Sequence, residues 1–313
     1  MKILFVGAGV IGTVYGANLA AAGDTVALLA HGTRTAEVVK RGLNARDVAD
    51  GGIVSASVQV VSDAGADAYD IVVVAVTRDQ LSTACASLTA LAGAPTILLL
   101  GNGIGRGAIS GAARERVCLG FPGVGGTLTG GTVDYVRIKP QPFALEASDD
   151  PRLEELAVHL VSRGFAVQRV DDMDGWLTYH AVLVACICAA LYRCGTDTQR
   201  LGRDRRTLHL MCMAVSQGFR SLRRQRVEGM PANLRFLHHR SLTAVAIAYW
   251  GRTMRASTGE LWFGAHARHA VAEMRALSAD VLERVGEDDG VARLRELLDP
   301  NGSSSRLPAS PLP

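Results

Sequence analysis

The chain has 313 residues, of which 48% are hydrophobic and 20% are charged, and its formal net charge is +3 at pH 7. This length and composition are typical of a globular protein with two domains and exclude a disordered or fibrous chain. The small net charge argues against a nucleic-acid partner, and the basic cluster at 220–226 is interpreted as a solvated helix face. The longest uncharged apolar run of the C-terminal half, 181–191, is shorter than the ~20 residues of a membrane-spanning helix.

The six cysteines form no C-x-x-C pair and have no histidine partner at zinc-ligand spacing. We therefore expect reduced, mostly buried thiols and no bound metal. Residues 2–6 are apolar but lead directly into a glycine-rich turn instead of a cleavage site, which predicts a cytoplasmic protein. The expected partner is a small-molecule substrate, without nucleic acid or membrane, and a homodimer is left open.

The most informative motif is G-x-G-x-x-G, which lies between an apolar strand-like segment and a run of small residues typical of a helix. In a dinucleotide site the first glycine permits the tight turn, the second lets the backbone approach the pyrophosphate, and the third lets the helix pack on the strand. The free N–H groups at the start of that helix face the anion. These residues are the predicted cofactor contacts: Gly7, Ala8, Gly9, Val10, Ile11 and Gly12.

The end of the second predicted strand, 25–30, lacks the carboxylate that binds the ribose of NAD. His31 and Arg34 follow instead, and both can pair with a 2′-phosphate. This favours NADP (NADPH) as the cofactor. The alternative is that Arg34 is a solvated charge at the start of a helix.

The first 170 residues alternate between strand and helix patterns, which predicts an α/β domain with a doubly wound parallel sheet of the Rossmann type. A continuous β-branched run at 71–76 is typical of a parallel strand covered on both faces. The predicted strands are 2–6, 25–30, 71–76, 96–100, 116–120, 134–138 and 166–170, and the predicted helices are 11–22, 78–90 and 152–163.

Residues 171–299 have an almost entirely helical pattern and are expected to form an all-α C-terminal domain that binds substrate. The predicted helices are 175–193, 204–226, 233–253 and 264–285. The Ser- and Pro-rich tail, 300–313, is predicted to be disordered. The expected site is a cleft between the two domains.

These marks together resemble the ketopantoate reductase family of NADP-dependent oxidoreductases. Besides the glycine motif and Tyr15-Gly16, the resemblance is carried by residues 30–32, 74–77 and 101–105, by Trp176 at the opening of the first C-terminal helix, and by 259–261. It covers most of the chain. The turn Asn-Gly-x-Gly at 102–105, combined with the later Trp-led helix, is more specific than the glycine motif.

The resemblance implies roles for residues in both parts of the chain. Asn102 would lie near the nicotinamide and the substrate, where its amide can both donate and accept; the alternative is a turn residue before a glycine. Val76 and Thr77, at a strand end, fall in the cofactor site. Glu260 is similar to the family's late glutamate that contacts the cofactor ribose, and a carboxylate at a helix start is the competing interpretation.

The chain departs from the family where the chemistry is expected. Thr77 and Thr178 stand in place of two family lysines, and Val182 and Cys186 stand in place of two asparagines. Positions 178, 182 and 186 share one helix face, so the expected substrate-facing stripe changes from polar to largely apolar. An alkyl hydroxyl does not ionise near neutral pH, so Thr178 cannot replace a general acid.

His180 is therefore the candidate proton donor, although it lies about 200° around the helix from position 178. The alternative is a packed core histidine. Four other histidines in the C-terminal half are interpreted as solvated: His238, His239, His266 and His269.

Two functions are consistent with the sequence. The first is an NADPH-dependent reductase that transfers hydride to a C=O or C=N carbon of a small, relatively apolar substrate. The second is a protein that binds NADP(H) without turnover or runs a redox-neutral reaction.

Overall fold

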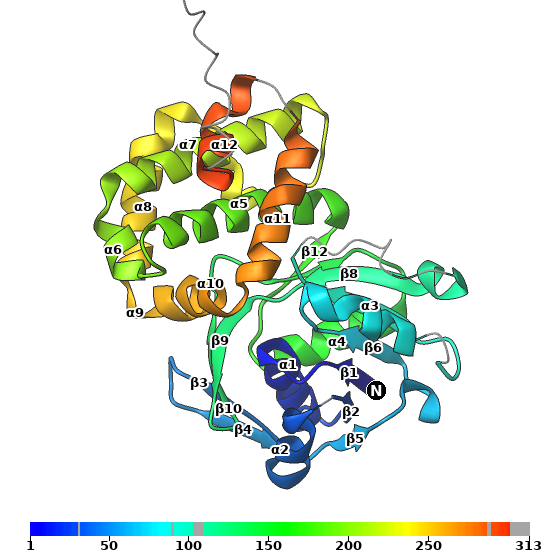
Figure 1. The fold of residues 1–313 in the computed structure, drawn as a ribbon. Helices are drawn as coiled ribbons and strands as arrows, with labels where there is room; N and C mark the ends of the chain where they lie inside the picture. Colours follow the sequence, from blue (N-terminus) through cyan, green and yellow to red (C-terminus); the bar gives the residue numbers. More distant parts are fainter. Residues whose placement is uncertain (31, 89–90, 103–108, 110, 287–288, 301–313) are drawn as a thin grey trace, which may run out of the picture. The chain divides into compact units, whose positions relative to one another are not determined.

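The computed structural model describes residues 1–300 except 31, 89–90, 103–108, 110 and 287–288. The chain divides into two compact units, Met1–Leu177 and Thr178–Pro313. Figure 1 shows the strands in the first unit and a set of helices in the second. The division lies seven residues after the boundary expected at 170, because the first residues of one long helix pack with the sheet. Residues 301–313 of the predicted tail lie outside the described residues.

The first unit is built on an eight-stranded sheet with the order β12-β11-β8-β7-β6-β1-β2-β5. Neighbouring strands are parallel except for β11 and β8. The inner order, β5-β2-β1-β6-β7-β8, is that of a Rossmann sheet, and the strand order reverses between β1 and β6. The strands are β1 (Lys2–Val6), β2 (Thr25–Leu29), β5 (Gln59–Val61), β6 (Ile71–Val74), β7 (Thr96–Leu100), β8 (Val117–Phe121), β11 (Phe143–Glu146) and β12 (Val167–Val170).

Both faces of the central strands of this sheet are buried, which explains the continuous apolar runs in their sequence. In β1, Ile3 and Phe5 face one core cluster, whereas Leu4 and Val6 face another. Alternate residues of a strand point to opposite faces, so every position of a doubly covered strand must be apolar. Helices α1 (Val10–Ala21) and α4 (Pro151–Ser162) contribute to the first cluster, and α3 (Arg78–Ser87) to the second.

A second, four-stranded sheet with the order β4-β3-β10-β9 was not expected from the sequence. It contains β3 (Leu43–Asp47), β4 (Ile53–Ala56), β9 (Val124–Thr129) and β10 (Thr132–Arg137). Residues 134–138 were predicted as a strand of the main sheet, and this was wrong: they fall largely in β10, which pairs with β3 and β9. The strands of this sheet are partly exposed, so they lack the fully apolar runs that mark the central strands of the main sheet.

The second unit is helical, as predicted, but two of the predicted helices are interrupted. Residues 233–253 form two 3-10 segments, Ala232–His238 and Arg240–Leu242, followed by α8 (Thr243–Arg255). Residues 264–285 divide at Ala270 into α10 (Ala265–His269) and α11 (Val271–Val285). The other helices are α5 (Met173–Arg193), α6 (Thr198–Arg203), α7 (Arg205–Arg224), α9 (Ser257–Gly259) and α12 (Ala292–Leu298).

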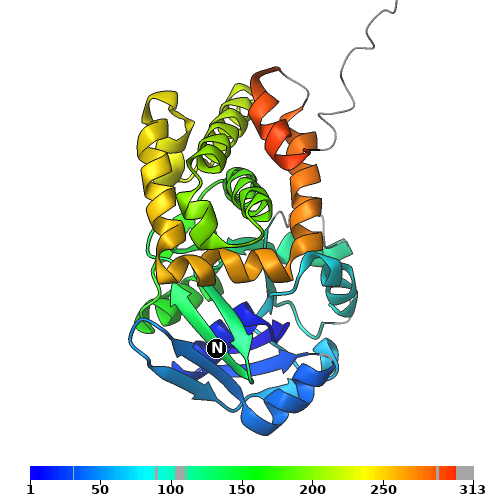
Figure 2. The ribbon, with the colours of Figure 1, turned by 60° about the vertical axis from the view of Figure 1, so that its left-hand side comes forward.

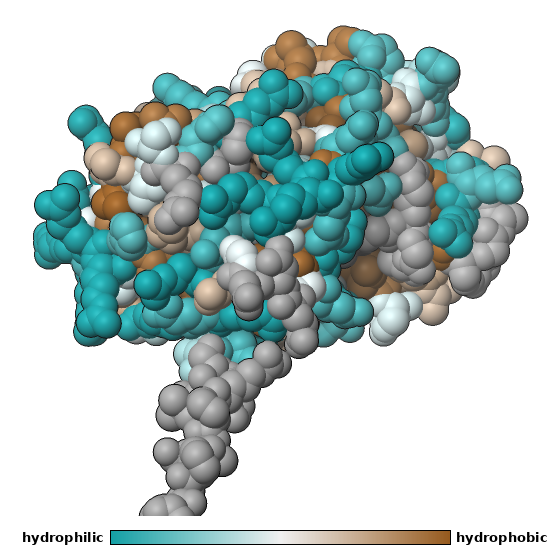
Figure 3. All heavy atoms as spheres, turned by 90° about the horizontal axis from the view of Figure 1, so that it is seen from above, coloured by the Kyte–Doolittle hydropathy of each residue, from teal (hydrophilic) through white to brown (hydrophobic). Residues whose placement is uncertain are grey.

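Helix α5 is the core of the second unit. Figure 2 shows it in green, viewed nearly along its axis, with α7, α8 and α11 around it. By its length and composition alone, this helix could cross a membrane. However, 89% of its most apolar 18-residue stretch is buried, as in the core helix of a globular protein. Hydrophilic side chains dominate the molecular face drawn in Figure 3, and the apolar residues there form small separate groups. The cytoplasmic location stays a prediction.

Candidate functional site

The glycine-rich loop joins β1 to α1, and its three glycines differ in the space around them. Gly7 has φ +107°, and a Cβ there would lie 2.5 Å from the carbonyl oxygen of Ala75. A Cβ on Gly12 would collide with the carbonyl oxygen of Gly7. Around Gly9, by contrast, no heavy atom of the described residues lies within 4 Å of such a Cβ. The loop is therefore closed against protein at its first and third glycines and open at its second.

Helix α1 begins at Val10, directly after the open glycine. No acidic residue occurs in its first turn, and Gly9 at the N-cap supplies no side-chain cap. The first N–H groups of a helix have no partner within the helix, and the helix dipole makes this end attractive to anions. The combination of exposed backbone donors and an open backbone is the arrangement that holds a phosphate.

Two further predicted residues lie beside this loop, at the end of β6. The amide of Ala75 donates to the carbonyl of Val6 over 2.9 Å. Val76 Cγ1 lies 2.9 Å from where a Cβ on Gly7 would be, and Thr77 is an exposed residue at the N-cap of α3. Thr77 makes no side-chain cap hydrogen bond. The Thr77 hydroxyl is therefore not used to cap α3 and lies at the carboxyl edge of the sheet.

Asn102 follows β7, the strand next to β6 in the sheet. Its Oδ1 is buried and has no hydrogen-bond partner among the described residues. Leaving a buried acceptor unpaired costs about 1–3 kcal/mol, so such an atom is often completed by a ligand or water. The Gly103, Ile104 and Gly105 positions of the predicted turn lie outside the described residues.

The loop, residues 76–77 and Asn102 therefore follow three neighbouring parallel strands, β1, β6 and β7. Carboxyl ends of parallel strands meet at one edge of a sheet, and ligands of open α/β sheets bind there, at the point where the strand order reverses. The structure thus brings the glycine loop, residues 76–77 and Asn102 to the same edge of the sheet.

Arg34 lies in α2 (Thr33–Arg41) and contacts the same loop. Its Nε donates to the carbonyl of Ala8 over 3.0 Å, and its Nη2 donates to Thr13 Oγ1 over 3.1 Å. Its Nη1 pairs with Glu37 Oε2 at 2.6 Å. The interpretation of Arg34 as a solvated charge is therefore wrong, since its side chain is only 13% exposed. His31 lies outside the described residues.

In the second unit, α5 carries the positions where the family lysine and asparagines were expected. Thr178 is half-buried. Val182 and Cys186 are 1% and 0% exposed and belong to the core cluster of this unit. Val182 packs on α7, where its Cγ1 lies 2.6 Å from the position of a Cβ on Gly218. The expectation that these two side chains face substrate is corrected: they fill the contact between helices of the same unit.

His180 is buried, and this burial lowers the pKa of its imidazole from 6.5 to about 3. Burial in a low-dielectric environment disfavours the charged form of histidine. The imidazole is therefore neutral at neutral pH and carries no imidazolium proton to donate. The role of His180 as a proton donor stays a prediction, and the lowered pKa of its imidazole argues against it.

Glu260 begins a π-helical turn, Glu260–Gly264, between α9 and α10. Its carboxylate forms an ion pair with Arg268. A Cβ on Gly264 would collide with Glu260 Oε2, so the glycine leaves room for the carboxylate against the helix. Single π-helical turns are rare and frequently occur at functional sites.

Two side chains with buried, unpaired nitrogens lie in or beside this turn, and of these only His266 was considered from the sequence. Trp262 Nε1 and His266 Nε2 are buried and have no hydrogen-bond partner in the part of the chain that the structure describes. Burial, with a smaller effect of His269, lowers the pKa of His266. The interpretation of His266 as solvated is therefore wrong. A helical pattern alone cannot reveal this, because it does not show that the turn is π-helical.

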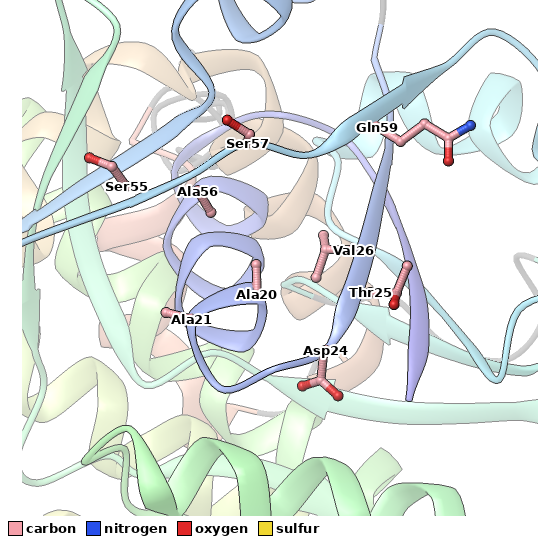
Figure 4. A pocket seen from close by; sticks show the side chains of 9 residues that line it. All are labelled: Ala20, Ala21, Asp24, Thr25, Val26, Ser55, Ala56, Ser57 and Gln59. Carbon is pink, nitrogen blue, oxygen red and sulfur yellow. The ribbon is translucent and has the colours of Figure 1, made fainter.

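The first unit also has a cavity of about 410 Å³ away from the glycine loop. Figure 4 shows its lining side chains, which come from the end of α1, the start of β2 and residues 55–59. This is the amino end of β2, whereas the glycine loop follows the carboxyl end of β1. Its buried acid, Asp24, is already paired with the Met1 ammonium and with His159. We assign no ligand to this cavity. In the described residues no group of three or more His, Cys, Asp or Glu could hold a metal ion.

Comparison with known proteins relates this arrangement to one family. The family model described as ketopantoate reductase PanE/ApbA matches residues 3–142. No curated protein matches the sequence.

Several solved structures share the fold over nearly the whole chain. The 2-dehydropantoate 2-reductase of Geobacter metallireducens GS-15 is 17% identical, with 97% of this chain and 100% of that chain covered and a TM-score of 0.73. D-mandelate dehydrogenase, solved with NADH and anilino(oxo)acetate, is 18% identical, with 97% and 99% covered and a TM-score of 0.71. The PanE/ApbA family ketopantoate reductase of Ralstonia eutropha JMP134 is 22% identical, with 91% and 98% covered and a TM-score of 0.65.

At these identities the likeness to the solved structures shows a common fold, and the sequence match is carried by the first unit. Residues 3–142 match the ketopantoate reductase PanE/ApbA family model, and the chain as a whole has the fold of the ketopantoate reductases to which it is similar.

Proposed function

We propose that this chain is an NAD(P)H-dependent oxidoreductase that transfers hydride to the carbon of a C=O or C=N bond in a small, relatively apolar substrate. It would thus act on CH–OH or CH–NH groups in the reverse direction. The observation that carries the proposal is the glycine loop, open only at Gly9 and placed where the strand order reverses. The family match over 3–142 supports it, as does the NADH in the similar D-mandelate dehydrogenase.

The residues of the first unit fit a dinucleotide. The backbone of Gly7, Ala8 and Gly9, with the amides of Val10, Ile11 and Gly12 at the start of α1, would hold the pyrophosphate. When bound, the nicotinamide supplies the hydride. Of the two cofactors we propose NADP(H) as the preferred one, because no carboxylate ends β2 and the sequence that follows supplies His31 and Arg34.

Asn102 would orient the reacting groups. Its buried, unpaired Oδ1 can accept a hydrogen bond, and its amide nitrogen can donate to a carbonyl or hydroxyl oxygen. Holding a reactant in one geometry removes part of the entropic cost of the reaction. Glu260 would accept hydrogen bonds from ribose hydroxyls, as the family resemblance implies.

We propose that no side chain of the expected type supplies the proton. Thr178 does not ionise near neutral pH, and the pKa of His180 is lowered to about 3. We therefore propose that the proton reaches a carbonyl substrate through water. An iminium substrate needs no acid at this step, because its nitrogen already carries the positive charge. A small, relatively apolar substrate suits a site in which Thr178 stands where the family resemblance implies a lysine.

The second candidate function is a protein that binds NADP(H) without turnover, and the replacement at Thr178 favours it. Titration of the purified protein with NADPH and NADH measures binding. The absorbance of the reduced nicotinamide is then followed with 2-oxo acids and cyclic imines. Oxidation with any of these substrates supports the reductase, binding without oxidation supports the second function, and no binding contradicts both.

A further inference from the structure

Arg34 does not stand free beside the glycine loop, because an acid on the same helix neutralises it. Glu37, one turn further along α2, accepts from Arg34 Nη1 over 2.6 Å. The Arg34 side chain is 13% exposed and that of Glu37 is 32% exposed. An ion pair this close and partly shielded from solvent is screened less than a surface pair.

The other two nitrogens of Arg34 also donate to the protein. Nε and Nη2 hold the carbonyl of Ala8 and the hydroxyl of Thr13, one on the loop and one in the first turns of α1. Nη1 also lies 3.5 Å from the carbonyl oxygen of Gly131. A bidentate grip on a 2′-phosphate needs two parallel N–H groups, so Arg34 would have to give up part of this network.

Glu37 is held in place by the turn between β9 and β10. Gly131 in that turn has φ +87°, and a Cβ there would collide with Glu37 Oε1. Arg41, at the end of α2, donates to the carbonyl of Gly130 over 3.2 Å. The turn therefore packs along α2 and keeps the carboxylate next to Arg34.

We infer that Glu37 is a specificity-determining residue that lets this site accept NADH as well as NADPH. The carboxylate opposes a 2′-phosphate by charge repulsion, and it can accept a hydrogen bond from a ribose 2′-hydroxyl. A positive and a negative group thus act on the same ribose. The two affinities are expected to lie within about tenfold of each other. The inference rests on the proposed binding of a nicotinamide dinucleotide.

The test measures dissociation constants for NADPH and NADH by calorimetry at fixed ionic strength. Glu37→Gln keeps the size and an acceptor oxygen but removes the charge, so NADPH is expected to bind at least about tenfold more tightly and NADH no more tightly than before. Arg34→Gln is expected to shift the ratio of the two affinities in the opposite direction. Glu115→Gln changes the net charge equally at an exposed residue of the 3-10 segment Gly111–Arg116 and is expected to leave the ratio unchanged.

The outcomes distinguish a failure of the proposed function from a failure of the inference about Glu37. If neither dinucleotide binds the unaltered protein, the proposed function fails. If both dinucleotides bind but the ratio of the two affinities is the same in Glu37→Gln as in Glu115→Gln, the inference about Glu37 is overturned. It is also overturned if the unaltered protein binds NADPH a hundredfold or more tightly than NADH, a difference of about 3 kcal/mol. Thermal unfolding of each variant shows that the fold is retained in the binding measurements.

Discussion

In the first unit the candidate cofactor site is made by backbone and open space, whereas in the second unit the candidate residues are side chains on α5 and on the turn Glu260–Gly264. Gly7 and Gly12 have protein atoms where any larger residue would place its Cβ. At position 178, by contrast, threonine stands where the family resemblance implies a lysine, and the surrounding helix is intact. A backbone site restricts the sequence strongly, while a site made of side chains can change its chemistry without changing the fold.

The strongest test of this contrast is Gly12→Ala. Its Cβ would meet the carbonyl oxygen of Gly7, which belongs to the backbone and cannot rotate away. We expect the free energy of unfolding to fall by about 3 kcal/mol or more. Denaturant unfolding measures it. A variant as stable as the unaltered protein would show that the loop tolerates more than its geometry indicates.

The pH dependence of stability tests the burial of His180. Its pKa is lowered from 6.5 to about 3, so the unfolded chain binds a proton more readily than the folded one. The stabilising contribution is complete above pH 6.5 and is lost as the pH falls toward 3. His180→Gln should reduce the loss of unfolding free energy across this window. Equal pH profiles for the two proteins would contradict the assigned burial.

Gly9→Ala sharpens the comparison, because it adds the same methyl group where no described atom lies within 4 Å. The backbone there has φ −73°, which alanine adopts without strain. We expect unchanged thermal stability and dinucleotide binding weakened by about 10- to 100-fold. Normal affinity would mean that the pyrophosphate does not approach this residue.

Asn102→Ala removes an acceptor that no described residue uses. The stability should therefore change little. If the amide contacts the cofactor or the substrate, turnover should fall by roughly tenfold or more, the equivalent of one lost hydrogen bond of about 1–3 kcal/mol. Steady-state kinetics with the best substrate from the panel measures it. Unchanged kcat and KM would leave Asn102 as a turn residue.

Trp262→Phe is expected to have the smallest effect. It removes the unpaired indole N–H and keeps an aromatic ring. If that N–H binds substrate, KM should rise by about five- to tenfold, with stability unchanged or slightly increased. Phe263→Leu, on the neighbouring residue, is the control for a general disturbance of the turn. A rise in KM in the control alone would place the substrate elsewhere.

The difference between a backbone site and a side-chain site also determines how much of the fold and of the candidate site can be predicted from the sequence. Strand β1, the glycine loop and β6 were predictable because each position there has a single physical requirement. The π-helical turn at Glu260 and the buried Nε2 of His266 were not, since a helical sequence pattern shows neither. Arg34 was recognised as a candidate, but its pairing with Glu37 and the loop could be seen only in three dimensions.

Strands β3 and β10 pair in parallel although they are separated by more than eighty residues, and β3 also pairs with β4. Contacts of such high sequence separation form late, because a long loop must close before any contact is gained. During synthesis the first β-α-β segment therefore emerges well before its small sheet can be completed. Until β10 is available, Leu43 and Ala45, which are fully buried in the finished unit, lack part of their covering. We expect this interval to be the stage at which the nascent chain is most exposed to misassembly.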